Sequence, residues 1–263
     1  MTSVREKASS FGSLLANSRY LLSSFALICS ISLITLPRVV DAQAVVLPPN
    51  FLETAVATDI AGPIGMEFSP DGRLFVLGGG ERRIEVYDEE GGGRLGVFIT
   101  LPQALRVGSG LLGLEFSPDF MTSGDVYIAY ITNPSYLLDD EPQRFRLSKF
   151  SSNGSIADPD SEVVLFEVID PRPDQTLHQG GDIAIGGDGK IYWALGDRAQ
   201  GMVVSQPLDS LFGKLLRLNV DGTIPTDNPF YDDLEGDFRA IYARMACEIH
   251  SEWRDRFQPA TSI

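Results

Sequence analysis

The hydrophobic residues of this chain gather in short runs that turn-forming residues separate. Five runs are rich in β-branched or aromatic side chains and are bounded by Gly, Pro, Asn or Asp: residues 83–87, 96–100, 145–150, 163–168 and 214–219. Beyond the amino-terminal segment, no stretch sustains the 3.6-residue apolar period of an amphipathic helix over about ten residues. Because 26 glycines and 16 prolines also interrupt the chain, the pattern predicts an all-β fold.

A predicted hairpin lies near the middle of the chain. Residues 182–186 and 191–195 have the composition of strands, and the Gly-Asp-Gly-Lys segment between them suits a tight turn. His178 precedes the first strand, in a loop position of the kind where catalytic groups are common. Its side chain has an unperturbed pKa of about 6.5, so much of it can accept a proton at pH 7. His178 is therefore the candidate general base, and a surface or loop-packing histidine is the alternative.

The strand-turn-strand pattern of this hairpin occurs twice earlier. Phe-Ser-Pro-Asp stands at residues 68–71 and again at 116–119, each time with an apolar run on both sides. Such recurrence of short strands predicts the blades of a β-propeller. The turn aspartates Asp71, Asp119 and Asp188 offer oxygen ligands for calcium, but their shared turn context favours a role in holding the local backbone. We predict no metal ligand among them.

The amino terminus has the layout of a secretory signal. Three basic residues, Arg5, Lys7 and Arg19, precede the uncharged apolar run 21–36, and Ala-Gln-Ala follows at 42–44. The run is shorter than the roughly 20 apolar residues that a membrane-spanning helix needs. Residues 1–44 are therefore predicted to be a signal peptide of a periplasmic or secreted protein, with an uncleaved membrane anchor as the alternative.

Charge and cysteine content exclude several classes of partner. The chain carries 36 acidic and 21 basic residues, a net charge of −15. Such a surface repels nucleic acid and anionic lipid, so neither is an expected partner. Of the two cysteines, Cys29 lies in the predicted signal and Cys247 near the carboxyl end, so the processed chain has no intramolecular disulfide. Neither cysteine has the spacing of a zinc site.

Four motifs, in order, resemble the amino-terminal half of the glucose/sorbosone dehydrogenase family. These proteins are soluble quinoprotein sugar dehydrogenases that use pyrroloquinoline quinone (PQQ). The resemblance extends over about residues 51–243. The matching stretches are Gly-Leu-Leu-Gly-Leu-Glu-Phe-Ser-Pro-Asp-Phe (110–120), His-Gln-Gly-Gly-Asp (178–182), Asp-Gly-Lys-Ile-Tyr through Gly-Asp (188–197), and the segment from Gly-Lys-Leu-Leu-Arg-Leu to Asn-Pro (213–229).

The resemblance implies a fold, a reaction and two cofactors. The fold is a six-bladed β-propeller of four-stranded sheets, represented in residues 45–243 by about three blades plus parts of their neighbours. The histidine matched by His178 acts in the family as general base on the hydroxyl of a sugar or related alcohol, while hydride passes to the quinone. Such a base is worth about 10²- to 10⁴-fold in rate. PQQ and Ca²⁺ are the implied cofactors.

Two positions depart from the family near the substrate. Val-Gly-Ser at 107–109 stands where the family often has Gln or Glu, and Leu177 replaces the acid that precedes the histidine in glucose-oxidising members. Each lost hydrogen bond to a charged group weakens sugar binding by about 1–3 kcal/mol. Glucose itself is therefore not the predicted substrate.

The carboxyl end departs further. Residues 244–263 replace the expected Gly-Leu-Arg-Asn-Pro motif, which supplies an arginine and an asparagine to the quinone, and the family's calcium ligands lie downstream of it. No cofactor- or metal-binding residue can therefore be assigned. We interpret 244–263 as a divergent tail produced by a frameshift or a premature end. The alternatives to an active dehydrogenase are a non-catalytic extracellular propeller that binds a protein or glycan, and an inactive fragment.

Overall fold

The computed structural model describes residues 47–53, 60, 62–78, 82–88, 93–101, 110–132, 142–172 and 177–245. The chain divides into two compact units, Met1–Leu52 and Glu53–Ile263, and every strand belongs to the second. Three predictions fall outside the described residues: the signal peptide 1–44, the stretch 107–109, and all but the first two residues of the tail 244–263. Within the described ranges, no helix is long and apolar enough to cross a membrane.

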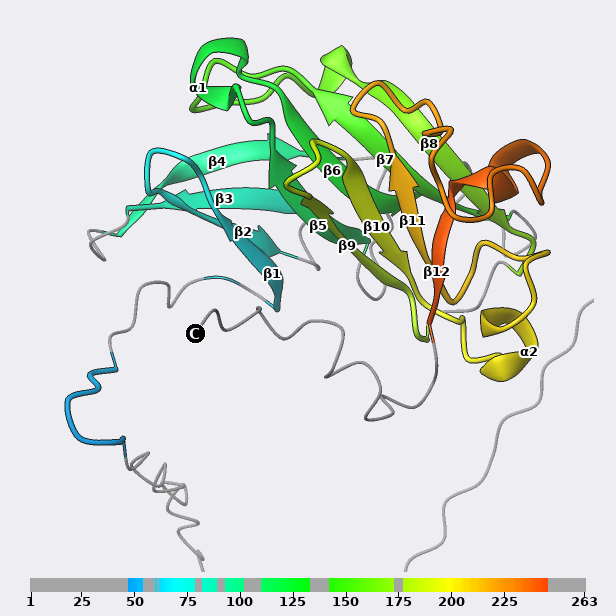
Figure 1. Ribbon diagram of the computed structural model, residues 1–263. Helices are drawn as coiled ribbons and strands as arrows, with labels where there is room; N and C mark the ends of the chain where they lie inside the picture. Colours follow the sequence, from blue (N-terminus) through cyan, green and yellow to red (C-terminus); the bar gives the residue numbers. More distant parts are fainter. Residues whose placement is uncertain are drawn as a thin grey trace, which may run out of the picture. The chain divides into compact units, whose positions relative to one another are not determined.

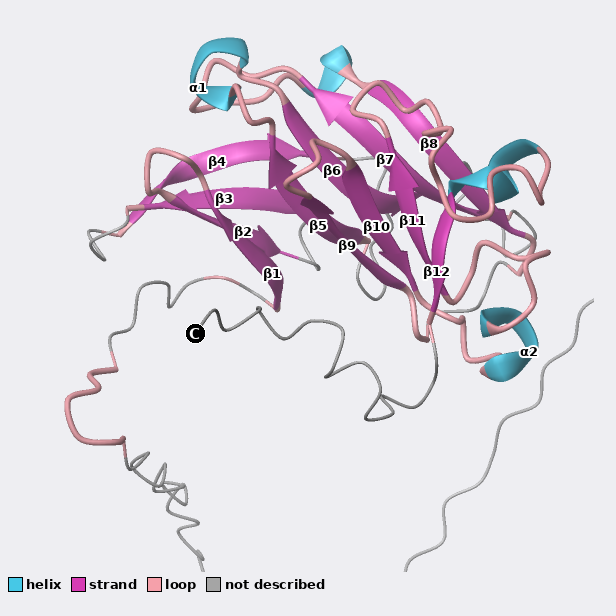
Figure 2. Cartoon of the chain, viewed as in Figure 1, coloured by secondary structure: helices cyan, strands magenta, loops and turns pink. Residues whose placement is uncertain are grey.

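Within these ranges, twelve strands form three four-stranded antiparallel sheets (Figures 1 and 2). The first sheet contains β1 (Pro63–Phe68), β2 (Leu74–Gly78), β3 (Arg83–Tyr87) and β4 (Arg94–Thr100). The second contains β5 (Leu111–Phe116), β6 (Val126–Thr132), β7 (Gln143–Phe150) and β8 (Val163–Asp170). The third contains β9 (Gly180–Ile185), β10 (Ile191–Leu195), β11 (Lys214–Leu218) and β12 (Ile241–Arg244).

Strands follow one another in chain order within each sheet, so each sheet is a simple meander. This is the unit from which β-propellers are built. The seven strands predicted from composition are all confirmed, with ends that differ by at most two residues. The strand β12 was not expected as a separate element, because its four residues are too few to show an alternating pattern.

In the part of the chain that the structure describes, helices are confined to short turns between strands, as the prediction of an all-β fold requires (Figure 2). The α-helical turns are α1 (Phe120–Ser123) and α2 (Met202–Ser205), and 3₁₀ turns occupy Pro159–Ser161 and Gly236–Ala240. Gly124 ends α1 in the left-handed conformation, with φ of 72°. A Cβ at this position would lie 2.0 Å from the carbonyl oxygen of Ser152, so glycine is required there.

The core consists of apolar layers between adjacent sheets. Phe75 of β2 contacts Phe98 of β4 and Phe116 of β5 edge to face, with ring centroids 4.9 Å apart in both pairs. The second layer, between the second and third sheets, contains the fully buried Trp193. Backbones also approach closely there, since a Cβ on Gly113 of β5 would lie 3.0 Å from the carbonyl oxygen of Gly181 in β9. Alternate residues of the second sheet therefore face one layer or the other.

The three turn aspartates hold local structure, as predicted. Asp71 accepts hydrogen bonds from Arg73 Nε at 3.0 Å and from Ser69 Oγ. Asp119 accepts similarly from the hydroxyl group of Ser117. Asp188 accepts from the backbone N–H of Lys190 at 3.1 Å. These contacts fix the turns that follow the first strand of each sheet.

Candidate functional site

His178 lies just before β9, beside the residue that follows β10. Because β9 and β10 are antiparallel, the start of one strand and the end of the other are neighbours. Nδ1 of His178 lies 2.7 Å from Oδ1 of Asp197, and the His178 side chain is 62% exposed. This exposure leaves the ring accessible from solvent while its Nδ1 side is engaged by the carboxylate.

Asp197 is fixed by the backbone around it. Its Oδ1 accepts the N–H of Ala199 at 3.0 Å, and its Oδ2 accepts the N–H of Gly201 at 3.1 Å. An ionised carboxylate only accepts hydrogen bonds, so the pair places the proton of a neutral ring on Nδ1 and the basic lone pair on Nε2. This is the arrangement in which a carboxylate orients a histidine that acts as a base.

The backbone at this pair is strained. Among the described residues, five that are not glycine have φ in the left-handed region, and three of them are here: His178 at 48°, Arg198 at 55° and Ala199 at 59°. Such conformations cost about 1–3 kcal/mol each and persist only where surrounding contacts hold them. The clustering of strain at an exposed histidine–carboxylate pair supports a functional role.

Glycines in the His-Gln-Gly-Gly-Asp motif permit this loop. Gly180 has φ of 64°, and a Cβ there would lie 2.4 Å from the backbone nitrogen of Gly196. Gly181 has φ of 112°, and a Cβ there would lie 2.4 Å from the side chain of Leu112 in the neighbouring sheet. The motif therefore positions His178 through backbone shape as well as through side-chain chemistry.

Behind the pair, a buried lysine supports the loop that carries α2. Nζ of Lys214 donates to the carbonyl oxygens of Val204 and Phe212 at 2.5 and 3.2 Å, and the side chain is fully buried. Burial, with a smaller contribution from Arg244, lowers the pKa of Lys214 to about 8. The same loop contains Gly201, whose N–H donates to Asp197, so Lys214 belongs to the support of the histidine–carboxylate pair.

A buried ion pair lies on the side of the second sheet. Asp170, at the end of β8, accepts from Nε of Arg198 at 2.8 Å and from Nε of Arg172 at 2.9 Å. Burial alone would raise the pKa of Asp170, but the hydrogen bonds from the two guanidinium groups hold it below its usual value. The carboxylate is therefore ionised and fully committed to these two arginines.

These contacts test whether the described residues fit the implied cofactors. PQQ carries carboxylates, which proteins bind with Arg or Lys. The guanidinium groups of Arg198, whose backbone contacts His178, and of Arg172 already pair with Asp170. No group of three His, Cys, Asp or Glu side chains suited to a metal ion occurs in the part of the chain that the structure describes. The His178–Asp197 pair is compatible with the implied reaction, but these residues provide no seat for the quinone carboxylates or for Ca²⁺.

Three carboxylate side chains, one on the first strand of each sheet, interact electrostatically. Burial, followed by the charge of Glu115, raises the pKa of Glu67 on β1. Burial also raises the pKa of Glu115 on β5, although backbone N–H groups of Phe116 and Ile185 oppose the shift. Asp182 on β9 adds negative charge to both. The sequence alone does not indicate this set, because the three residues come from strands far apart in the chain.

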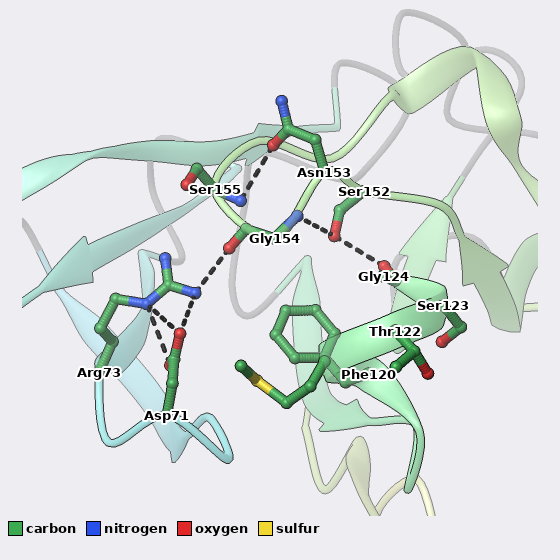
Figure 3. Close-up of a pocket in the computed structure, with 11 residues that line it drawn as sticks. Asp71, Arg73, Phe120, Thr122, Ser123, Gly124, Ser152, Asn153, Gly154 and Ser155 are labelled. Atoms are coloured by element: carbon green, nitrogen blue, oxygen red, sulfur yellow. Dashed lines mark hydrogen bonds and ion pairs between the residues drawn. The ribbon is translucent and has the colours of Figure 1, made fainter.

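A separate pocket of about 410 Å³ lies at the other ends of the first strands, after β1 and β5 (Figure 3). Arg73 pairs with Asp71 on one side, and its Nη2 donates to the carbonyl oxygen of Gly154 at 2.7 Å. On the opposite side lies α1, and the loop of Ser152 and Gly154 reaches from α1 to Arg73. The arginine thus links the first sheet to the second, and its charge is already balanced.

The fold and the pair together define a class: this chain is a β-propeller protein, with three blades described and a histidine–carboxylate pair at the start of the third. It belongs to the glucose/sorbosone dehydrogenase family, whose model matches residues 60–244. The resemblance predicted from the motifs is therefore confirmed.

Individual relatives agree with this assignment. The chain is 27% identical over 242 residues to quinoprotein glucose dehydrogenase B of Acinetobacter calcoaceticus, covering 81% of this chain and 50% of that protein. It is 31% identical over 206 residues to aldose sugar dehydrogenase YliI of Escherichia coli K12, covering 76% and 52%. The PQQ-bound aldose sugar dehydrogenase of Streptomyces coelicolor superposes with a TM-score of 0.56 at 28% identity, over 67% of this chain and 50% of that one. The chain spans about half the length of the curated relatives it matches, and its three sheets correspond to half of a six-bladed propeller.

Proposed function

We propose that this chain supplies the general base for PQQ-dependent oxidation of a sugar or a related alcohol. The observation that carries the proposal is the 2.7 Å contact between Nδ1 of His178 and Asp197, at a side chain that is 62% exposed. A buried histidine in the core could not reach a substrate. The backbone of His178 lies in the left-handed region, and a residue other than glycine stays there only where surrounding contacts hold it.

In this proposal His178 removes the proton of the reacting hydroxyl group. Nε2 accepts the proton, and Asp197 stabilises the imidazolium that forms by accepting the hydrogen bond from Nδ1. Oxidation also removes a hydride from the carbon that bears this hydroxyl group, and the chemistry for accepting it would come from the quinone named for the relatives. The residues of this chain hold and receive the proton.

Both the relatives and the departure from the family at Leu177 bear on the class of substrate. The named relatives act on aldose sugars, which supports a polyhydroxylated substrate. The exposed Leu177 beside His178 offers no hydrogen bond from its side chain to such a substrate. We therefore propose a sugar or alcohol that is held less tightly on this side than in a glucose-oxidising enzyme.

The proposed site of action is the periplasm or the outside of the cell, with Ca²⁺ assisting the quinone. The amino-terminal pattern of basic residues, apolar run and Ala-Gln-Ala supports export. The calcium ligands and the cationic seat for the quinone would have to come from residues other than those described.

An assay of aldose-dependent dye reduction tests the proposal. The purified chain is incubated with PQQ and Ca²⁺, and a panel of aldoses and polyols is screened at pH 7. Reduction that disappears in His178→Ala supports the proposal. Met202→Ala is the matched control, because the side chain of Met202 is exposed on the neighbouring α2. An absence of reduction, or a His178→Ala variant as active as the unaltered chain, would overturn it.

A further inference from the structure

A buried arginine connects the histidine–carboxylate pair to the neighbouring blade. The side chain of Arg198 is fully buried, and its Nε donates to Asp170 at 2.8 Å while its Nη2 donates to Oε1 of Gln143 at 2.6 Å. Its guanidinium carbon lies 4.8 Å from the ring centroid of Phe145. Arg198 follows β10 of the third sheet, whereas the other three residues belong to β7 and β8 of the second.

The backbone of the same residue contacts the pair directly. The N–H of Arg198 donates to the carbonyl oxygen of His178 at 3.2 Å, and Arg198 follows Asp197 in the chain. Its own carbonyl oxygen accepts from Nη1 of Arg172 at 3.4 Å. One residue therefore contacts His178 through its backbone and the second sheet through its side chain.

Arg198 also has an unusual backbone conformation. Its φ is 55°, in the left-handed region that a residue with a Cβ leaves unless other contacts hold it. Release of the side chain would let the backbone relax to negative φ. That change would move the downstream N–H groups of Ala199 and Gly201, which hold the carboxylate of Asp197, and would so release the carboxylate from its orientation toward Nδ1 of His178.

We infer that Arg198 is a positioning residue, whose buried anchorage to Asp170 and Gln143 keeps the turn in the conformation that aims Asp197 at His178. The inference rests on the proposed function of the His178–Asp197 pair, and it adds a dependence of that pair on the contact between two blades. The orientation of the base is thus set by a neighbouring blade that contributes no group to the pair itself.

Two substitutions at one position separate this role from that of an ordinary buried ion pair. Arg198→Ala and Arg198→Gly both remove the guanidinium group, but glycine adopts positive φ without strain. A residue that only contributes to stability would make the two variants alike, or the glycine variant worse. If Arg198 instead holds a strained turn, Arg198→Gly preserves the contact between His178 and Asp197 better than Arg198→Ala does. This holds whatever the two substitutions do to the melting temperature.

The measurement is the tautomer of His178 in the full-length protein, read from ¹⁵N chemical shifts of labelled histidine at a pH where the ring is neutral. Signals of the second histidine are assigned with His250→Gln. We expect a dominant Nδ1–H tautomer in the unaltered chain, a several-fold loss of it in Arg198→Ala, and substantial retention in Arg198→Gly. The matched control is Arg146→Ala, which removes the ion pair between Arg146 and Glu167 in the second sheet. This variant is expected to leave the tautomer of His178 unchanged.

Equal tautomer populations in the alanine and glycine variants would overturn the inference. If Arg198→Ala does not fold, Gln143→Met replaces it, since it removes one acceptor of Arg198 at nearly constant volume. Gln143→Met is expected to shift the tautomer in the same direction by a smaller factor, and no shift would contradict the inference. The readout uses neither substrate nor quinone, so a lack of dye reduction would count against the proposed function alone.

Discussion

The carbonyl oxygen of His178 occupies the space where a side chain on Gly196 would begin, since a Cβ at Gly196 would lie 1.9 Å from that oxygen. This overlap is between backbone and Cβ, so no side-chain rotation relieves it. The Gly-Asp dipeptide at 196–197 therefore serves the loop twice, by giving space to the histidine backbone and by supplying its carboxylate partner.

Gly196→Ala is accordingly expected to displace the His178 loop and to lower the melting temperature by several degrees, which corresponds to a loss of about 1–3 kcal/mol for overpacking. Thermal unfolding followed by circular dichroism measures the change. Gly187→Ala is the matched control, because it lies in the turn of the same hairpin, has an ordinary φ and finds no atom within 4 Å of its added Cβ. Equal melting temperatures for the two variants would contradict the assigned contact.

The raised pKa of Glu115 predicts a pH-dependent effect on stability. Burial makes the folded state hold the Glu115 proton more tightly than the unfolded state does, so this group favours folding at low pH and loses that contribution as the pH rises above 4.5. Glu115→Gln stays neutral at every pH. We expect it to raise the melting temperature relative to the unaltered chain more at pH 7 than at pH 4.

The control for this comparison is Glu235→Gln, which alters an exposed carboxylate away from the first strands. Its effect on melting temperature is expected to be small at both pH values. A gain for Glu115→Gln that is no larger at pH 7 than at pH 4 would show that burial does not control this carboxyl group.

The lowered pKa of Lys214 predicts the opposite dependence of stability on pH, in alkaline solution. Its folded pKa of about 8 lies below the usual lysine value of 10.5, so between these values the unfolded chain binds more protons than the folded one. The contribution of Lys214 to unfolding free energy therefore rises with pH across this window. Replacement by Met removes that contribution.

Chemical unfolding at pH 7.5 and pH 9.5 gives the test. The unaltered chain is expected to gain stability relative to Lys214→Met as the pH increases, even though the variant also leaves the carbonyl groups of Val204 and Phe212 without their lysine donor. A constant difference between the two proteins across this range would contradict the lowered pKa.

Most of the fold could be predicted from local sequence patterns. The run 191–195 matches β10 residue for residue, because a short apolar strand bounded by a Gly-Asp-Gly turn has few alternatives. The turn role of Asp188 was likewise predictable, although its ion pair with Arg217 of β11 was not. That contact depends on which strands become neighbours, and the hairpin alone does not specify it.

The site was predictable only in part, for the same reason. His178 could be nominated because histidine is rare in this chain and precedes a strand. Asp197 stood within a recognised motif, but its role required the antiparallel pairing of β9 with β10. The contact of Arg198 with Asp170 joins residues 28 positions apart in different sheets, and no local period or composition indicates it.

Asp197→Asn probes the carboxylate without changing its size. The amide cannot stabilise an imidazolium ion as the carboxylate does, so dye reduction is expected to fall by about 10²- to 10⁴-fold, the range of general-base assistance. The binding of quinone, followed by its absorbance, is expected to stay unchanged. A loss of quinone binding in place of a loss of rate would assign Asp197 to the cofactor instead of the base.

The most direct measurement of the central claim is a double-mutant cycle on His178 and Asp197, with aldose-dependent dye reduction as the readout. Two residues that act as one base lose their function together, so the account predicts that His178→Ala combined with Asp197→Asn is no slower than His178→Ala alone. Additive losses, or a His178→Ala variant that keeps the full rate, would contradict the claim that the pair removes the proton.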